Sequence, residues 1–397
     1  RPVDAGVSGQ QCARTFSERM TAMTQSRKLG WRALIVLLAA LACAGTWAAG
    51  QVRSIRDRSA VAKMTEKMKT VCVGRFLVDV PAHADIGLSH EMIDGFELDT
   101  VEESETSFRE RVAAREAAIG THGVATDSRG TGGMVEARDL RVPNMVGRIL
   151  VYGRTRSYRM DGNRRVDDEW VSIEVHAHLN GSSIALSMKY ADQPDVYSAE
   201  ALLARLHPRD PDEIPSIPGF CIQHAVFTEP LPPHKTEHIV MHLGLPGHPD
   251  MGLALSSTPS GQTGKSLLER VAETDAEASA DETLRVTKLR LGKRGINGIA
   301  GEEVLERVRE LNFTTGYGFM GEALGTKDDP MHPYLLLNME TGTNPRPRGN
   351  PVDSSLHEDA VLALWDSISS TIRRRPVKRL EDHPPSGKPA ASSRDRT

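Results

Sequence analysis

Aromatic residues are scarce in this 397-residue chain, as are cysteines and any excess of charge of one sign. Phe, Trp and Tyr make up 5% of the residues, which argues against a pocket lined with aromatic rings or a platform for stacked bases. The 49 Lys and Arg residues are matched by 53 Asp and Glu residues, so nothing indicates a nucleic-acid-binding surface. Hydrophobic residues still amount to 39%, enough for packed cores, and the length suits two domains.

An export segment is the first feature along the chain. Basic residues up to Arg32 precede the apolar stretch Ala33–Ala44, and small residues follow it. This order is typical of a secretory signal peptide, so residues 1–50 are predicted to be a signal peptide or N-terminal hydrophobic segment. An uncleaved membrane anchor and a lipid attached to Cys43 are the alternatives, and either would attach the protein to a membrane.

Cysteine is rare, and only two of the four cysteines, Cys72 and Cys221, lie beyond the export segment. In an oxidising compartment these two can form one disulfide. Two buried free thiols on strands are the alternative. Neither residue belongs to a Cys-x-x-Cys pair, and nothing marks either as a nucleophile.

The first half of the exported part alternates strands and helices after a polar segment, 51–67, that we interpret as a linker or short helix. Alternating apolar and polar residues predict strands, and Asn180-Gly181 predicts a hairpin turn between two of them. The strands are expected at Cys72–Val80, Trp170–Leu179 and Ser183–Tyr190, and the helices at Ser104–Ala118 and Ala199–Leu206.

The second half repeats the first. Cys221 lies in an opening segment like the one that contains Cys72, and residues 266–272 share five of seven positions with residues 107–113. Further matches follow in the same order. They are a glycine before a strand (Gly147 and Gly301), a strand ending in methionine (Met188 and Met339) and a closing helix, the second at Leu356–Ile372.

This order of elements predicts an α+β fold of two similar domains, each an antiparallel sheet with helices packed on one face. Four prolines between residues 208 and 218 indicate the domain boundary. We therefore place the N-terminal domain at 68–215 and the C-terminal domain at 216–376. Residues 377–397, rich in Pro, Ser, Lys and Arg, are predicted to be a disordered tail.

No catalytic residue, cofactor site or metal site is predicted. Gly316–Gly321 matches the G-x-G-x-x-G pattern, but a dinucleotide site needs a helix directly after the glycines. Gly325, Pro330 and Pro333 interrupt that stretch, so we expect a glycine-rich loop between strands.

Two groups of histidines have the spacing of metal ligands but fit strands better. On a helix, the four-residue spacing of His234, His238 and His242 would place three imidazoles on one face. The apolar residues between them alternate, so we expect a strand with His238 and His242 on its polar side. Glu174, His176 and His178 are likewise expected on the solvated face of a strand, and His90-Glu91 lacks the second histidine of a zinc protease motif.

The opening segment of the exported part, MKTVCVGRFLVDVP at residues 68–81, resembles a known family. It is similar to the two-domain immunity proteins that protect bacteria from type VI secretion phospholipase effectors. Residues 298–303 and 332–337 resemble the C-terminal domain of that family, and the likeness covers roughly residues 66–375. It implies a periplasmic inhibitor whose two domains form a claw. The claw grips one α/β-hydrolase lipase, one to one, and keeps phospholipid from its active site without cofactor or catalysis.

Two other classes of function are alternatives. One is an envelope structural or cell-wall-binding module, which would co-purify with peptidoglycan. The other is a metal-dependent envelope enzyme that holds its metal on the histidine-bearing strands, which metal analysis would reveal. No partner-contacting residue can be assigned from the resemblance.

Overall fold

The computed structural model describes residues 38, 41, 44, 45 and 47–376, apart from 123–129, 230–236, 260–263, 297 and 328. The chain divides into two compact units, residues 1–62 and 63–397. In the first unit residues 47–62 are helical, so the segment interpreted as a linker begins as a helix. No helix in the described part of the chain is both long and apolar enough to cross a membrane. Most of the predicted signal peptide, and Cys43, lie outside the described residues.

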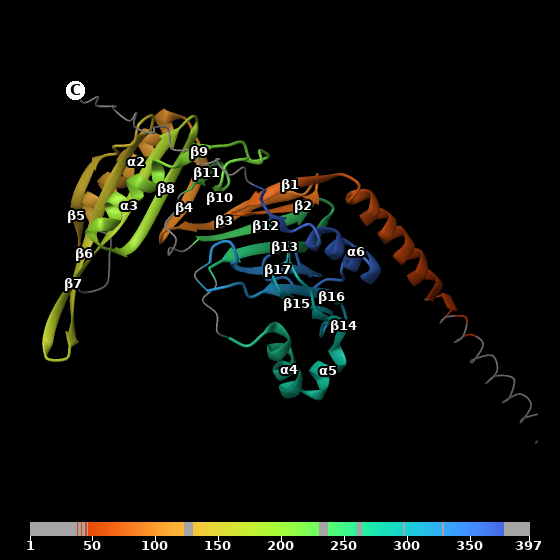
Figure 1. The fold of residues 1–397 in the computed structure, drawn as a ribbon. Coiled ribbons are helices and arrows are strands. Elements are labelled where there is room, and N and C mark those ends of the chain that lie inside the picture. The colour runs from red at the N-terminus through yellow and green to blue at the C-terminus, as the bar shows by residue number, and fades with distance from the viewer. Residues whose placement is uncertain are drawn as a thin grey trace, which may run out of the picture. The chain divides into compact units, whose positions relative to one another are not determined.

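A twelve-stranded antiparallel sheet forms the centre of the second unit (Figure 1). The first half of the chain contributes β3 (Asp85–Ile93), β4 (Phe96–Glu102), β5 (Gly130–Asp139), β6 (Val146–Asp161), β7 (Arg164–Leu179) and β8 (Ser182–Ala191). The second half contributes β12 (Glu237–Leu245), β13 (His248–Thr258), β14 (Val286–Lys293), β15 (Gly301–Arg309), β16 (Thr315–Ala323) and β17 (Tyr334–Thr341). The spatial order is β14-β15-β16-β17-β13-β12-β3-β4-β8-β7-β6-β5.

The predicted duplication is visible in this strand order. Read outward from the β3–β12 pair, both halves follow the same path, with β4, β8, β7, β6 and β5 matching β13, β17, β16, β15 and β14. The halves do not form separate sheets, because the first large strand of one pairs antiparallel with the first of the other, from Asp85↔Gly244 to Ile93↔Glu237. Joining the two sheets hides two edges that would otherwise offer unpaired backbone groups.

Two small three-stranded sheets exchange strands between the halves. One contains β1 (Met68–Val73), β2 (Phe76–Pro81) and β18 (Arg373–Arg374), and the other β9 (Leu206–Pro208), β10 (Gly219–Cys221) and β11 (Ala225–Thr228). The last strand of the first half, β9, pairs with β11 of the second half, and β18 at the end of the second half pairs with β2 of the first. Each half therefore completes the opening hairpin of the other.

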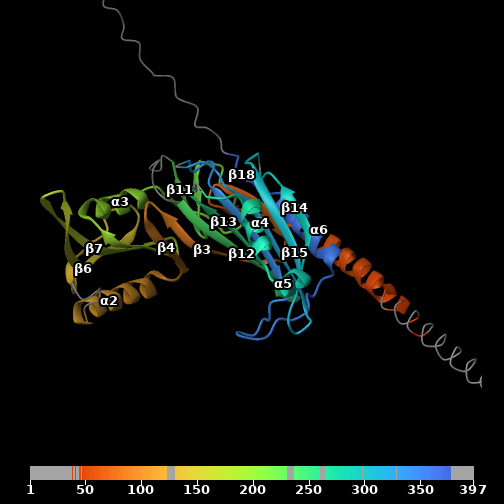
Figure 2. The ribbon, with the colours of Figure 1, turned by 90° about the horizontal axis from the view of Figure 1, so that it is seen from below.

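Helices cover both faces of the large sheet, so the expectation that they pack on one face is wrong. The helices are α2 (Glu105–His122), α3 (Gln193–Leu203), α4 (Leu267–Glu277), α5 (Ala280–Arg285) and α6 (Glu358–Ser369). Figure 2 shows α2 and α3 on opposite sides of the first half. Following the strand register across the sheet places α2 and α4 over one face, here called the α2/α4 face. The same register places α3 and α6 over the other, the α3/α6 face.

Two local predictions need correction. The segment Cys72–Val80 is a hairpin of β1 and β2 rather than one strand, because Gly74 turns the chain with φ +59°. A Cβ on Gly74 would also lie 2.8 Å from the ring of Phe220, so both the positive φ and the close contact require glycine here. The glycines of Gly316–Gly321 lie within strand β16 and not in a loop. At Gly321 the missing side chain leaves room for the indole of Trp365, 3.2 Å from where a Cβ would stand.

Candidate functional site

The α3/α6 face is closed where the two halves meet. Cys72 and Cys221 open equivalent hairpins, and a disulfide joins them with their Cα atoms 6.0 Å apart. Beside it, Gly74 and Cys221 exchange two backbone hydrogen bonds of 2.9 and 3.1 Å. The two small sheets lie over the junction strands there, and Ile239 and Met241 of β12 are fully buried beneath them. At the junction of the two halves, this face of the sheet is therefore part of the core.

Glu91 is a carboxylic acid buried at this junction, with 4% of its surface exposed. Its Oε1 accepts the backbone N–H of Gln223 at 2.9 Å, and the side chain of Gln223 in turn accepts the N–H of Leu88. Burial raises the pKa of Glu91 to about 7, although the bond from Gln223 and the charge of Arg209 both favour the ionised form. The folded protein therefore retains a proton that the unfolded chain releases at lower pH.

We expect the free energy of unfolding to fall as the pH rises from about 4.5 to 7, because over this range the unfolded chain releases the Glu91 proton while the folded protein retains it. Glu91→Gln keeps the acceptor for Gln223 and should raise the free energy of unfolding above pH 7 by about 3 kcal/mol. Urea titrations from pH 5 to 8 measure this, with the exposed Glu97→Gln as the control. Equal pH slopes for wild type and Glu91→Gln would contradict it.

The α2/α4 face, in contrast, is open over the four strands in the middle of the sheet. These strands are β3, β12, β13 and β17, and two rows of paired residues cross them on this face. One row is Gly87, His242, Ala254 and Asn338, and the other is Asp85, Gly244, Gly252 and Glu340. We call these eight residues the floor. A Cβ on Gly87, Gly244 or Gly252 would meet no atom within 4 Å. A hollow of about 520 Å³ lies over the part of the floor that the second half of the chain contributes, between His242, Gly252, Asn338 and Glu340.

Helix α2 bounds the floor on the side of the first half. Its Arg115 holds Glu174 of β7 through two hydrogen bonds of 2.5 and 2.9 Å, and Phe108 stacks on His178 with ring centroids 5.4 Å apart. Burial opposes the ionisation of Glu174, but hydrogen bonds from Arg115, His176 and Tyr152 outweigh burial and lower its pKa. The helix is therefore fixed to the sheet by a charged group that stays ionised.

Helix α4 bounds the floor on the other side in the same manner. The guanidinium of Arg270 forms an ion pair with the buried Glu322 of β16, and the backbone N–H of Leu268 donates to Glu302 at 2.9 Å. Lys288 of β14 links Asp275 of α4, at 3.0 Å, with Glu306. Both helices are thus anchored through carboxylates on the outer strands, and the inner strands between them stay uncovered by any helix among the described residues.

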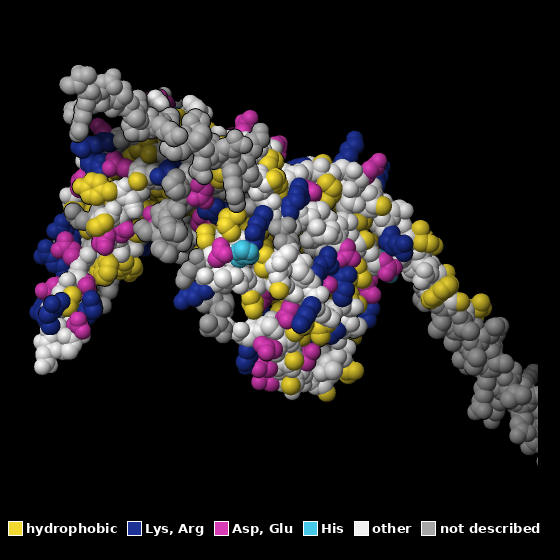
Figure 3. Space-filling view, in the orientation of Figure 1, with side chains coloured by type: hydrophobic (Ala, Val, Ile, Leu, Met, Phe, Trp, Pro, Cys, Tyr) yellow, Lys and Arg dark blue, Asp and Glu magenta, His cyan; other side chains and the backbone are white. Residues whose placement is uncertain are grey.

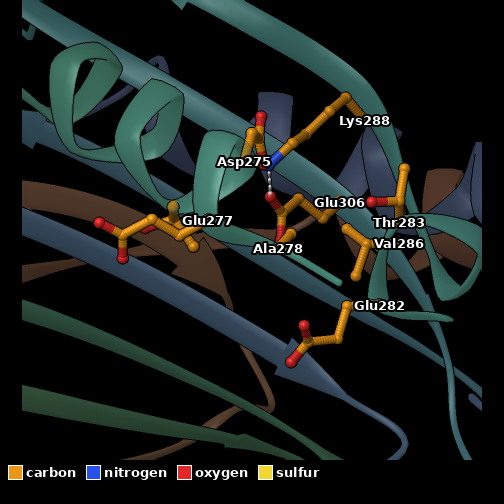
Figure 4. A pocket seen from close by; sticks show the side chains of 9 residues that line it. Asp275, Glu277, Ala278, Glu282, Thr283, Val286, Lys288 and Glu306 are labelled. Carbon is orange, nitrogen blue, oxygen red and sulfur yellow. Dashed lines mark hydrogen bonds and ion pairs between the residues drawn. The ribbon is translucent and has the colours of Figure 1, made fainter. Parts of the chain in front are cut away.

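A second hollow, of about 600 Å³, lies between α4, α5 and the strands β14 and β15. Figure 4 shows Glu277, Glu282, Asp275 and Glu306 around it, with Lys288 reaching between the last two. Among the described residues of the first half, no helix corresponds to α5.

The histidines of the described residues do not form a ligand set, although the rings of His90 and His238 are neighbours, with centroids 6.5 Å apart. His176 and His178 are buried under α2, so the expectation of a solvated strand face is wrong there. His242 is exposed on the floor, with Nε2 2.9 Å from the hydroxyl of Ser89, and His238 bonds to Thr258. His234 is outside the described residues. Within the described ranges no three His, Cys, Asp or Glu side chains are grouped to hold a metal ion.

The floor itself was not identified from the sequence, although a signal for it exists. In β13 the buried Leu253 and Leu255 alternate with Gly252 and Ala254, and Gly244 lies opposite Gly252 at the end of β12. Glycine within a strand is found where a ligand or another backbone approaches closely.

Comparisons with known proteins agree with this architecture. Residues 69–200 match the model of the Tle cognate immunity protein 4 N-terminal domain, and residues 213–377 match that of its C-terminal domain. No curated protein matches the chain significantly. The structure resembles a chain in the crystal structure of the Tle4-Tli4 complex, with TM-score 0.64 and 25% identity over 79% of this chain and 99% of that one.

Two more solved structures are similar. They are the immunity protein TplEi of the type VI secretion system (T6SS) from Pseudomonas aeruginosa in its apo form, and the same protein complexed with "L" peptide. Both are 25% identical and cover 78% of this chain, with TM-scores of 0.63 and 0.61 and coverage of 98% and 99% of their own chains. This chain belongs to the family of Tle cognate immunity protein 4 and contains both of its domains.

Proposed function

We propose that this protein is a periplasmic immunity protein that binds a type VI secretion phospholipase effector, one to one, and sterically blocks its active-site entrance. Membership of the Tle cognate immunity protein 4 family supports the partner class. The export segment predicted at residues 1–50 supports the compartment. In this proposal the protein acts without catalysis, because blocking an entrance requires surface complementarity and no nucleophile.

The observation that carries the proposal is the open floor between α2 and α4. The two helices lie on the same face of one continuous sheet, each fixed to its own half, and the floor between them consists of glycine, alanine and polar residues. In the proposed claw, the domains at 68–215 and 216–376 are the two jaws and an effector segment lies on the floor. Contacts from two jaws on one chain raise the effective concentration of the second contact.

We expect Gly252→Trp to weaken effector binding by at least about 100-fold, because an indole placed on the floor occupies the space assigned to the effector. The free protein should stay folded, since a Cβ at this position meets nothing within 4 Å. The measurement is calorimetric titration of the cognate phospholipase effector, together with inhibition of its hydrolysis of phospholipid vesicles.

The matched control is Gly292→Trp on β14, where a Cβ also meets nothing within 4 Å but the residue pairs with Glu303 on the α3/α6 face. This variant should bind and inhibit like wild type. Equal affinity of Gly252→Trp and Gly292→Trp would remove the floor from the interface. Failure of the wild-type chain to bind the cognate phospholipase effector would overturn the immunity function itself.

A further inference from the structure

Strands β6 and β7 extend far beyond the sheet to which they belong. Neighbouring β5 pairs with β6 only as far as Thr155, and β8 pairs with β7 only from Val171. From Arg156↔Glu169 to Asp161↔Arg164 the two strands have only each other as partners among the described residues. We call residues 156–169 the arm; it is the projection at the lower left of Figure 1, and its six residue pairs span about 20 Å.

The arm is an addition that the fold does not need. Its counterpart in the second half, the hairpin of β15 and β16, has nine residues in each strand, whereas β6 and β7 have sixteen. An isolated two-stranded hairpin is at best marginally stable in water. A long hairpin added to one half alone is therefore better explained by a contact outside the chain than by the stability of the sheet.

Two irregularities at its base redirect the arm. In β6 the register shifts between Tyr152 and Thr155, around Gly153 with φ +66°. The pairing of β7 with β8 also shifts register near the base of the arm, between Val171 and Ile173. On β8 this shift lies around Tyr190, which is exposed and has φ +57°. Bulges of this kind bend strands and re-aim the side chains beyond them.

One face of the arm carries an ordered apolar pair. Tyr158 and Met160 are neighbours on this face, and 61% and 58% of their surfaces are exposed. The guanidinium of Arg165 lies 4.3 Å from the centre of the Tyr158 ring, and its Nε donates to Asp167, the residue opposite Tyr158, at 2.7 Å. The ring is thus held in place before any partner arrives, which lowers the entropy lost on binding.

The charges of the arm fit a protein pocket better than an anionic membrane. Arg156 pairs with Glu169, Arg159 with Asp168, and Arg165 with Asp167, so most of the positive charge is neutralised within the hairpin. Figure 3 shows basic and acidic side chains mixed on this projection. A hairpin that binds lipid head groups would instead show unpaired Lys and Arg.

We propose that the arm inserts Tyr158 and Met160 into the acyl-chain-binding groove of the phospholipase effector. The inference rests on the proposed function and deepens it, because it names the effector surface that is occupied. An enzyme that hydrolyses phospholipids must bind apolar chains, so its entrance is an apolar groove. An aromatic ring and a flexible thioether at the end of a narrow hairpin match such a groove in shape and polarity.

The test uses the intact chain with Tyr158→Ser and Met160→Ser together. We expect the dissociation constant for the effector to rise at least about 100-fold, as for the loss of two buried anchors. The matched control is Leu311→Ser with Phe313→Ser, two exposed apolar residues at the equivalent turn of the second half, which should change affinity less than about threefold. Circular dichroism and unchanged midpoints of denaturation establish that both variants are folded.

A competition experiment identifies the groove. Monomeric diheptanoyl phosphatidylcholine, which fills an acyl-binding site, should weaken binding of wild type and have little further effect on the arm variant. Unchanged affinity of the arm variant, or no competition by the lipid, would overturn the inference. Binding of the arm to anionic vesicles in the absence of effector would also overturn it. If the wild-type chain does not bind the effector at all, the proposed function fails instead.

Discussion

Replacing Cys72 and Cys221 together by alanine is expected to lower the free energy of unfolding by about 5 kcal/mol in the chain-entropy account of disulfides. The reason is the length of the closed loop, because the two cysteines are 149 residues apart in sequence. Both side chains are fully buried against Leu77 and Val226, so replacing them by alanine leaves only a small cavity. Guanidinium denaturation, monitored by circular dichroism, gives the difference.

Wild type treated with dithiothreitol provides the control for this variant. It should lose a similar amount of stability, which is recovered on reoxidation. A loss below about 1 kcal/mol for the double variant would show that the β3–β12 pairing and the exchanged strands alone hold the halves together. Because disulfides persist mainly in oxidising compartments, a large loss also means that the protein reaches full stability only in such a compartment.

Replacing Arg375 by methionine is expected to lower the free energy of unfolding by roughly 3–5 kcal/mol, because three buried carbonyl groups lose their donor. Arg375 follows β18 and is 4% exposed, and its guanidinium donates to the carbonyls of Pro215, Ile217 and Gly219 at 2.6, 2.6 and 2.7 Å. Burial, and the nearby charges of Arg75 and Arg209, lower its pKa to about 10, so it remains charged at neutral pH.

The control is Arg373→Met, two residues earlier. Arg373 forms an ion pair with Asp79 at 2.9 Å near the surface, and its loss should cost less than about 1 kcal/mol. The urea denaturation midpoints of the two variants show whether Arg375 stabilises the whole fold or only its immediate surroundings. Equal midpoints would mean that the segment 215–219 needs no anchor from the C-terminal strand.

Arg209 holds the first half in an equivalent way. Its side chain donates to the carbonyls of Pro211, Glu213 and Ile222. The backbone N–H of Arg209 donates to the carbonyl of His224, and the backbone N–H of Arg375 likewise donates to the carbonyl of Arg75. Through its backbone N–H, the arginine at the end of each half therefore bonds to the opening hairpin region of the other half. Separate expression of 51–215 and 216–376 would break both of these backbone bonds, so tests of the two jaws need substitutions in the intact chain.

The repeat could be recognised from the sequence because it depends on local features. Gly147 and Gly301 illustrate this: a Cβ would come within 2.4 Å of the His176 carbonyl at the first and 2.5 Å of the Arg294 carbonyl at the second. A backbone approach that close admits only glycine, so both copies retained it. The turn Asn180-Gly181 is confirmed for the same kind of reason, since both residues have positive φ.

The sequence by itself therefore determined the antiparallel α+β class, the duplicated order of elements and the family, since strand alternation, turn residues and obligatory glycines are written in short segments. It did not determine that the two sheets join at β3 and β12, that β9 and β18 are exchanged, or that His176 and His178 are buried under α2. Those outcomes depend on pairings between residues far apart in the chain. Only the tertiary structure decided them, because which edge pairs and which face is covered follows from the lowest free energy of the whole assembly of strands and helices.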